Sequence, residues 1–144
     1  KEYRRRFTSR FERWLDQGHG SCLLAQKEAA RLVEATMKHF EGERSKLHAW
    51  VLMPNHVHVM FSLIEPCSLP DLMKSWKGFT ARQLNQHFGK TGTVWQRSYF
   101  DRIVRDWDHF ANCARYIRNN PAKAKLPADS FLQGESDLVR KLLA

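Results

Sequence analysis

The chain has 144 residues, enough for one domain, and its 42% hydrophobic and 12% aromatic content excludes low-complexity disorder. No stretch approaches the roughly 18 consecutive apolar residues that a membrane span requires. The 24 lysines and arginines exceed the 15 acidic residues and give a net charge of +9, which indicates a polyanionic partner. Nucleic acid is the first candidate and an anionic membrane surface the second. The basic residues are spread along the chain, which favours nucleic acid.

The cysteines indicate a reducing compartment. Cys22, Cys67 and Cys113 are odd in number and widely spaced, which argues against a disulfide framework. The sequence begins with Lys1 and shows no signal peptide. We therefore expect a cytoplasmic protein.

The first twenty residues are predicted to form a basic helical segment. Aromatic residues recur there at helical spacing with arginines between them, at Tyr3, Phe7, Phe11 and Trp14. Gly18 and Gly20 would end this helix. A second helix is predicted over 26–40, where an apolar stripe faces a charged side.

Two strands in a hairpin are predicted next, over 47–52 and 56–63. Met53, Pro54 and Asn55 lie between them as a tight connection, because proline does not fit a paired interior position and asparagine favours turns. This pair would be antiparallel.

A long helix should begin after Ser68, which can cap it, and end before Gly89. The aromatic and β-branched residues of 94–105 predict one or two further strands.

Asp106 can cap a last long helix that reaches Asn120, where Pro121 would stop it. The tail over 128–144 contains a short helical pattern at 138–143. Helices thus alternate with strands, which predicts a single α+β domain with a small antiparallel sheet.

The strongest local signal for chemistry is a histidine pair. His56 and His58 share one face of the predicted strand, while Val57 and Val59 point to the other. Two imidazoles about 7 Å apart along a strand can chelate one divalent metal. A hydrogen-bonded or solvent-facing pair without a metal is the alternative.

Tyr116 and Asn120 form the second signal, because four residues place both side chains on one helix face. Two imidazoles and an amide oxygen suit Mg²⁺ or Mn²⁺, with Zn²⁺ an option at the histidine pair. A neighbouring tyrosine could attack phosphorus and form a covalent phosphotyrosine.

Three runs of sequence resemble one family. They are VLMPNHVH at 51–58, VWQRSYFDR at 94–102 and YIRNNPAKAKL at 116–126. In this order and spacing they are similar to the single-tyrosine HUH transposases, and more narrowly to the REP-associated tyrosine transposases of bacteria. The resemblance covers roughly residues 20–127.

The resemblance implies a metal-dependent endonuclease and strand transferase that acts on single-stranded DNA. His56, His58 and Asn120 would hold the divalent metal, Mg²⁺ or Mn²⁺. Tyr116 would be the nucleophile, forming a 5′-phosphotyrosine and releasing a 3′-hydroxyl. The implied substrate is a REP element, a DNA hairpin next to a short guide tetranucleotide.

The resemblance also implies a ferredoxin-like HUH fold whose sheet begins with a strand ahead of the first long helix. No strand pattern is apparent there, so the expectation is a sheet whose first strand is missing from this sequence. The segment before residue 20 then resembles a helical insertion of some family members.

Basic residues near the motifs are candidate DNA contacts, namely Arg97, Arg102, Arg118 and Lys77. We expect hairpin or single-stranded DNA as the partner of a monomer at the bacterial nucleoid, although relatives include dimers. No membrane partner and no small-molecule cofactor are expected.

Three other functions remain open. A structure-specific DNA-hairpin binder without catalysis would not need the histidine pair and Tyr116 together. A relaxase or replication initiator tends to have a third histidine and a larger domain. A structural zinc site would need a cysteine at zinc-finger spacing, which the sequence lacks.

Overall fold

The computed structural model describes residues 9–15, 22–96 and 100–144. Its strands are β1 (Ser9–Leu15), β2 (Ser45–Met53), β3 (His56–Leu63), β4 (Phe100–Val104) and β5 (Leu132–Glu135). Its α-helices are α2 (Lys27–His39), α3 (Leu69–Phe88), α4 (Trp107–Lys123) and α5 (Asp137–Leu142), and its 3₁₀ turns are η1 (Leu23–Ala25) and η2 (Ala128–Ser130).

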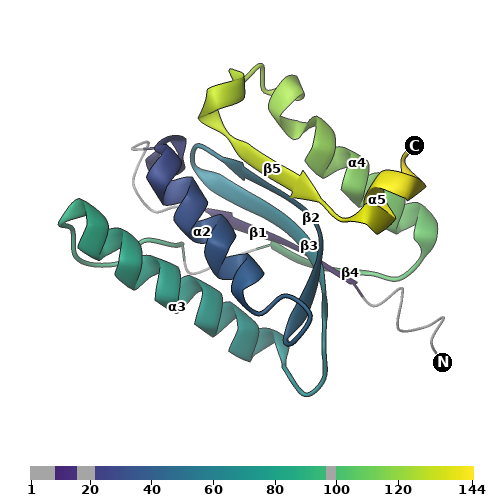
Figure 1. The fold of residues 1–144 in the computed structure, drawn as a ribbon, viewed down its shortest axis with the longest axis horizontal. Coiled ribbons are helices and arrows are strands. Elements are labelled where there is room, and N and C mark those ends of the chain that lie inside the picture. Colours follow the sequence, from purple (N-terminus) through teal and green to yellow (C-terminus); the bar gives the residue numbers. More distant parts are fainter. Residues whose placement is uncertain (1–8, 16–21, 97–99) are drawn as a thin grey trace.

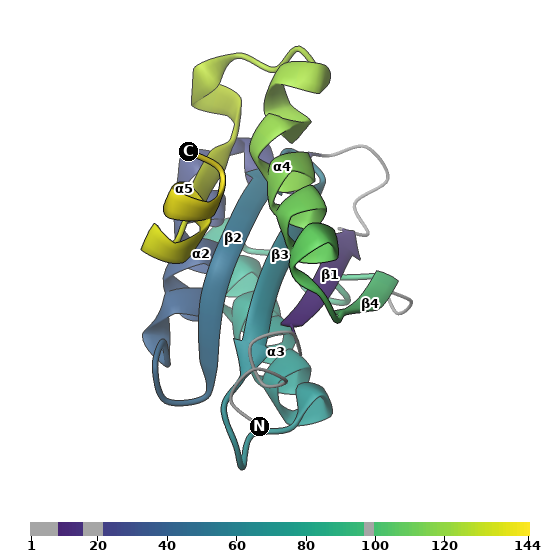
Figure 2. The same cartoon turned by 90° about the vertical axis from the view of Figure 1, so that its right-hand side faces the viewer.

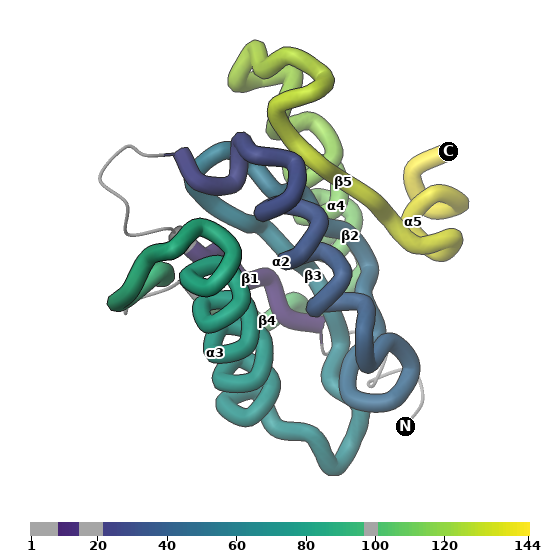
Figure 3. The backbone as a smooth tube through the Cα atoms, turned by 60° about the vertical axis from the view of Figure 1, so that its left-hand side comes forward, coloured from purple at the N-terminus to yellow at the C-terminus, as the bar shows by residue number. Residues whose placement is uncertain are grey.

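The strands form one antiparallel sheet in the order β4-β1-β3-β2-β5 (Figure 1). Helices cover both of its faces. Figure 2 shows α4 in front of the sheet, and Figure 3 shows α2 and α3 in front of the other face. The α+β class with a small antiparallel sheet is confirmed.

The prediction of a helix before residue 20 is wrong for the described part, because residues 9–15 form β1. The expected absence of the first strand is wrong as well, since β1 pairs with both β3 and β4 inside the sheet. Phe11 packs toward α4 and Trp14 toward α3, so both faces of the strand are buried. A strand buried on both sides loses its polar alternation and can imitate helical spacing. The remainder of the segment lies outside the described residues.

The predicted hairpin is present as β2 and β3. A bulge in β2 between Leu47 and Ala49 shifts the register of the pair. Leu47 belongs to the core under α2 and α3, whereas Ala49 belongs to the core under α4. His48 also turns toward α4, where its ring lies 5.1 Å from the ring of Phe110. The bulge therefore places two consecutive side chains on the face that α4 covers.

The long helices begin where the sequence predicts. Ser68 accepts a hydrogen bond from the amide of Asp71 at 3.3 Å, and Asp106 accepts one from the amide of His109 at 2.7 Å. These side chains satisfy amide groups that the first helical turn leaves without partners.

The predicted end of the last long helix is wrong, because Pro121 lies inside α4 and the helix reaches Lys123. Pro121 has no amide hydrogen to donate to the carbonyl four residues earlier and its ring crowds that carbonyl, but the ring is buried, and this burial offsets the cost. Lys125 stops the helix with φ 55°, while the amide of Leu126 donates to the carbonyl of Pro121. This arrangement is a Schellman motif.

Strand β5 was not predicted, and it depends on a close approach between two residues. Gly134 pairs with Trp50 of β2, and the indole ring lies over the glycine. The ring is held from its other side, because its Nε1 donates to Glu34 at 2.8 Å and Lys38 lies 5.2 Å from its centroid. Only a residue without a side chain fits beneath it.

Glu12 is fully buried in β1, on the face that α3 covers. It pairs across the sheet with Asp101 of β4. The pKa of Glu12 is raised to about 9, chiefly by burial and further by Asp101, with Lys77 and Arg10 opposing the rise. The carboxyl group is therefore protonated at neutral pH.

Within the described residues, no helix combines the length and the apolar character that crossing a membrane requires.

We expect Gly134→Ala to lower the free energy of unfolding by about 1–3 kcal/mol, because overpacking forces held groups apart. The added Cβ would lie 2.6 Å from Cε2 of Trp50. Urea unfolding measures the change. Gly78→Ala in α3 is the control, since its Cβ would lie 3.4 Å from the Arg82 guanidinium, and we expect a gain of about 0.5–1 kcal/mol. A Gly134→Ala protein as stable as the parent would contradict the account of β5.

The protonated Glu12 also predicts a loss of stability at alkaline pH. The folded state keeps this proton up to about pH 9, whereas the unfolded chain releases it near 4.5. Stability should therefore fall as pH rises, by at most about 1.4 kcal/mol per unit. Urea midpoints at pH 7, 8 and 9 should fall for the parent and stay nearly level for Glu12→Gln. The exposed Glu28→Gln should keep the parental slope, and an equal slope in Glu12→Gln would refute the assignment.

Candidate functional site

The histidine pair lies on the face of the sheet that α4 covers. His56 and His58 point the same way from β3, as predicted, and their ring centroids are 4.7 Å apart. His58 is buried, with 3% of its surface exposed, while His56 lies partly exposed at the start of the strand. Backbone pairing on both sides of β3 fixes this position.

The ring nitrogens of the pair suit metal binding. Nδ1 of His56 lies 2.7 Å from Oδ1 of Asn55, and because an amide oxygen accepts, the ring donates there. This bond sets the tautomer that leaves the lone pair on Nε2, as in many metal-binding histidines. Nδ1 of His58 is buried and has no hydrogen-bond partner among the described residues. A buried nitrogen in this state fits a bound metal or an ordered water.

His58 is neutral over the physiological pH range. Its pKa is lowered to about 3, chiefly by burial and to a smaller extent by the positive charges of His56 and Arg13. A neutral imidazole is the form that binds metal.

Tyr116 lies against this pair. Its ring stands edge-on to the ring of His58, with centroids 5.3 Å apart, and tilts against Phe11 at 5.9 Å. Ile117 and Phe110 hold α4 on the sheet from its buried side. The tyrosine side chain is nevertheless 47% exposed, so a ligand can reach it.

A cavity of about 440 Å³ opens beside Tyr116 and His58. Its wall combines aromatic rings with cationic and amide groups, contributed by Phe11, Arg13, His58, Arg102, His109, Asn112, Cys113 and Tyr116. Such a wall can hold both a base and a phosphate.

The structure brings together only part of the predicted site. His58, Tyr116 and Arg102 line the cavity, and His56 contacts His58. Asn120 lies one turn beyond Tyr116 on α4, and it is not among the described residues of the cavity wall. As a metal ligand it stays a prediction.

Two other predicted DNA contacts, Lys77 and Arg118, are not among the residues that line this cavity. Lys77 belongs to α3 on the opposite face of the sheet, where its ammonium lies 5.8 Å from the Trp14 ring centroid. Arg118 forms an ion pair with Glu135 at 2.6 Å. Arg97 lies outside the described residues.

Sequence reasoning did not name five residues of the cavity wall as site residues, namely Phe11, Arg13, His109, Asn112 and Cys113. A strand pattern for residues 9–15 would have placed Phe11 and Arg13 on one face. His109 precedes Tyr116 by seven residues, a spacing of two helical turns that returns to the same face.

Comparisons with known proteins identify a family and structures of similar fold. The family model described as transposase IS200 like matches residues 21–120. An uncharacterised protein of Haemophilus influenzae is 30% identical over 98 residues, which cover 53% of this chain and 54% of that protein. The chain thus spans about half the length of that curated relative.

Two solved structures share the fold. A REP-associated tyrosine transposase bound to a REP hairpin has a TM-score of 0.65 and 22% identity, covering 82% of this chain and 68% of that chain. A Deinococcus radiodurans R1 protein assigned as a transposase has a TM-score of 0.55 and 22% identity, covering 77% and 88%.

We expect Arg13→Gln to raise the pKa of His58 by up to about one unit, because it removes a nearby positive charge. Titration of the imidazole Cε1 protons by NMR, with a chelator present, measures it. Lys46→Gln is the reciprocal control. Lys46 lowers the pKa of His48, so this variant should raise that value and leave His58 unchanged. An unmoved His58 in Arg13→Gln would remove Arg13 from the electrostatics of the site.

Proposed function

Because the chain belongs to the IS200-like transposase family, we propose that it cleaves and rejoins single-stranded DNA through a covalent link to Tyr116. The observation that carries this proposal is the contact between Tyr116 and His58 at the edge of a cationic cavity. The rings of Tyr116 and His58 have centroids 5.3 Å apart, so the phenol and a metal held by the imidazole could act on the same phosphodiester.

His56 and His58, with Asn120 as the proposed third ligand, would hold a divalent cation, for which Mg²⁺ and Mn²⁺ are the candidates. When bound, the cation supplies Lewis-acid polarisation of a phosphodiester oxygen. The neutral state of His58 and the tautomer of His56 support this assignment.

Tyr116 would do the covalent chemistry. Its phenolic oxygen attacks phosphorus, a P–O bond to the tyrosine forms, and the bond to the 3′-oxygen breaks. The phenolic proton passes to water, and the departing 3′-oxygen takes up a proton to become a hydroxyl. The 5′-phosphotyrosine conserves the energy of the broken phosphodiester, so a later 3′-hydroxyl can displace the tyrosine without ATP.

The proposed substrate is a REP-type DNA hairpin with a single-stranded flank. The net charge of +9 suits a polyanion, and Arg13 and Arg102 bring two of these charges to the cavity. The relative of similar fold that is bound to a REP hairpin supports this substrate class. Such a protein would act at the bacterial nucleoid.

A second candidate is a hairpin-binding protein without cleavage activity. It is favoured by one observation, that Asn120 is not among the described residues around the cavity that holds His58 and Tyr116. Binding without a covalent product would identify this function.

We expect Tyr116→Phe to abolish the covalent product and to change hairpin affinity less than twofold, because the ring remains and only the nucleophile is lost. End-labelled hairpin oligonucleotides with Mg²⁺ or Mn²⁺, resolved on a denaturing gel, reveal a protease-sensitive adduct. His58→Ala, or a chelator added to the parent, should also remove the product. An adduct that persists in Tyr116→Phe would exclude the proposed nucleophile, and one that persists without metal would exclude the proposed cofactor.

A further inference from the structure

We propose that Arg118 is a positioning residue, which ties the tyrosine helix α4 to strand β5 and so sets the place of Tyr116 over the histidine pair. This inference rests on the proposed function, because it assigns Arg118 a part in that reaction. It replaces a direct DNA contact as the main role of the guanidinium group.

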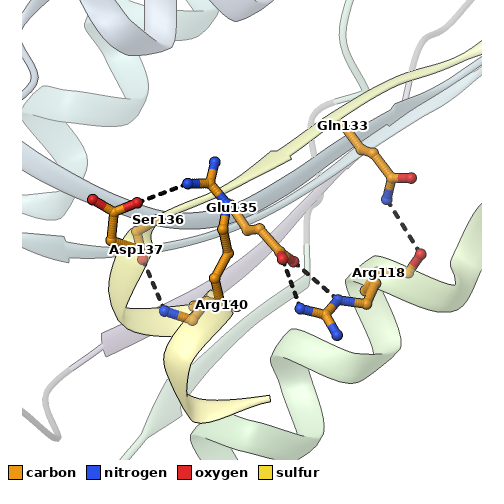
Figure 4. A network of polar contacts seen from close by, with 7 residues as sticks. Arg118, Gln133, Glu135, Ser136, Asp137 and Arg140 are labelled. Carbon is orange, nitrogen blue, oxygen red and sulfur yellow. Dashed lines mark hydrogen bonds and ion pairs between the residues drawn. The ribbon is translucent and has the colours of Figure 1, made fainter. Parts of the chain in front are cut away.

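The tie consists of three hydrogen bonds between one residue of α4 and two of β5 (Figure 4). Nε and one terminal nitrogen of Arg118 donate to the two carboxylate oxygens of Glu135, at 3.1 and 2.6 Å. The backbone carbonyl of Arg118 accepts from Nε2 of Gln133 at 3.2 Å. Both the side chain and the main chain of one helical residue are therefore held.

Apolar packing alone does not determine how α4 is rotated. Phe110, Ala114 and Ile117 press the helix onto the sheet, but apolar contact is non-directional. A forked guanidinium–carboxylate pair has a defined geometry. The Arg118–Glu135 pair therefore fixes the rotation of α4 about its axis and its position along that axis, which the apolar contacts constrain less.

Arg118 and Tyr116 lie on opposite flanks of the helix. Two residues correspond to a turn of about 200° around the axis. Tyr116 leans toward Phe11 of β1, whereas Arg118 reaches toward β5 at the far edge of the sheet. Any rotation that moves the guanidinium therefore moves the phenol by the same angle.

Strand β5 is itself firmly attached, which makes it a suitable anchor. It pairs with β2 at four positions, and the amide of Ser136 donates to the carbonyl of His48 at 2.8 Å. Val139 of α5 is buried in the same core as α4. Gln133 and Glu135 thus connect α4 to β5. Strand β5 pairs with β2, and β2 pairs with β3, which carries the histidines.

Glu135→Ala tests the tie, and Asp137→Ala is the matched control. Asp137 carries the same charge two residues later, and its carboxylate pairs with Arg140 of its own helix (Figure 4). The two variants therefore change net charge equally, and with it the general attraction for DNA.

The first measurement is the single-turnover rate of adduct formation at saturating hairpin DNA, together with the Kd for the hairpin. We expect Glu135→Ala to lose at least tenfold in rate relative to Asp137→Ala, because small misplacements of a reacting group are costly. The two Kd values should agree within twofold. A rate loss accompanied by an equal loss of affinity, with unfolding at the assay temperature, would show general damage and overturn the positioning role.

The second measurement does not depend on activity. Cys113 lies between the core under α4 and the wall of the cavity and is 7% exposed, so the rate of its alkylation rises when the helix turns or lifts from the sheet. Mass spectrometry of its peptide should show at least a tenfold faster reaction in Glu135→Ala than in Asp137→Ala.

Equal adduct rates and equal Cys113 reactivity in the two variants would overturn the inference. If the parent protein forms no adduct, the proposed function fails. The reactivity of Cys113 then decides alone whether the tie holds α4.

Discussion

Strand β3 is hydrogen-bonded along both edges, to β1 on one side and β2 on the other, and the candidate site depends on this constraint. A strand held on both edges cannot shift by one residue without turning every side chain to the wrong layer. Val57, Val59 and Phe61 fill the core under α2 and α3. His56 and His58 must then face α4, even though burial of an imidazole costs free energy of hydration.

The same burial sets the charge state of the interior. His58 and His48 have pKa values lowered to about 3 and about 4, and Glu12 has a pKa raised to about 9, in each case chiefly through loss of water. All three groups are therefore uncharged near neutral pH. The positive charge of the chain is left to surface and rim positions such as Arg102, where it can meet phosphate groups.

Much of this organisation could be predicted from the sequence. The alternation of apolar and polar side chains predicted the β2–β3 hairpin and the common face of the two histidines. The cap residues Ser68 and Asp106 predicted where α3 and α4 begin. The contact between His58 and Tyr116 could be expected from the family resemblance, although no local pattern specifies a distance between segments about sixty residues apart.

The predictions that failed, for β1, β5 and the end of α4, did so for physical reasons. In β1, burial of Phe11, Glu12 and Trp14 on opposite faces removed the alternation that identifies a strand. In β5, four residues with a glycine at the centre carry little strand propensity, and the pairing depends on the ring of Trp50. The end of α4 was missed because Pro121 is accommodated inside the helix with its ring buried, and Lys125 supplies the left-handed conformation that ends the helix.

The interior position of β1 has a consequence for how the chain assembles. Ser9 meets Ser62 across 53 residues, and Arg10 meets Asp101 across 91. During synthesis this strand leaves the ribosome long before either neighbour exists, and contacts of such sequence separation slow folding. Until β3 and β4 have been synthesised, Phe11 and Trp14 cannot be buried in the two cores. Both side chains are then exposed to chaperones or to other nascent chains.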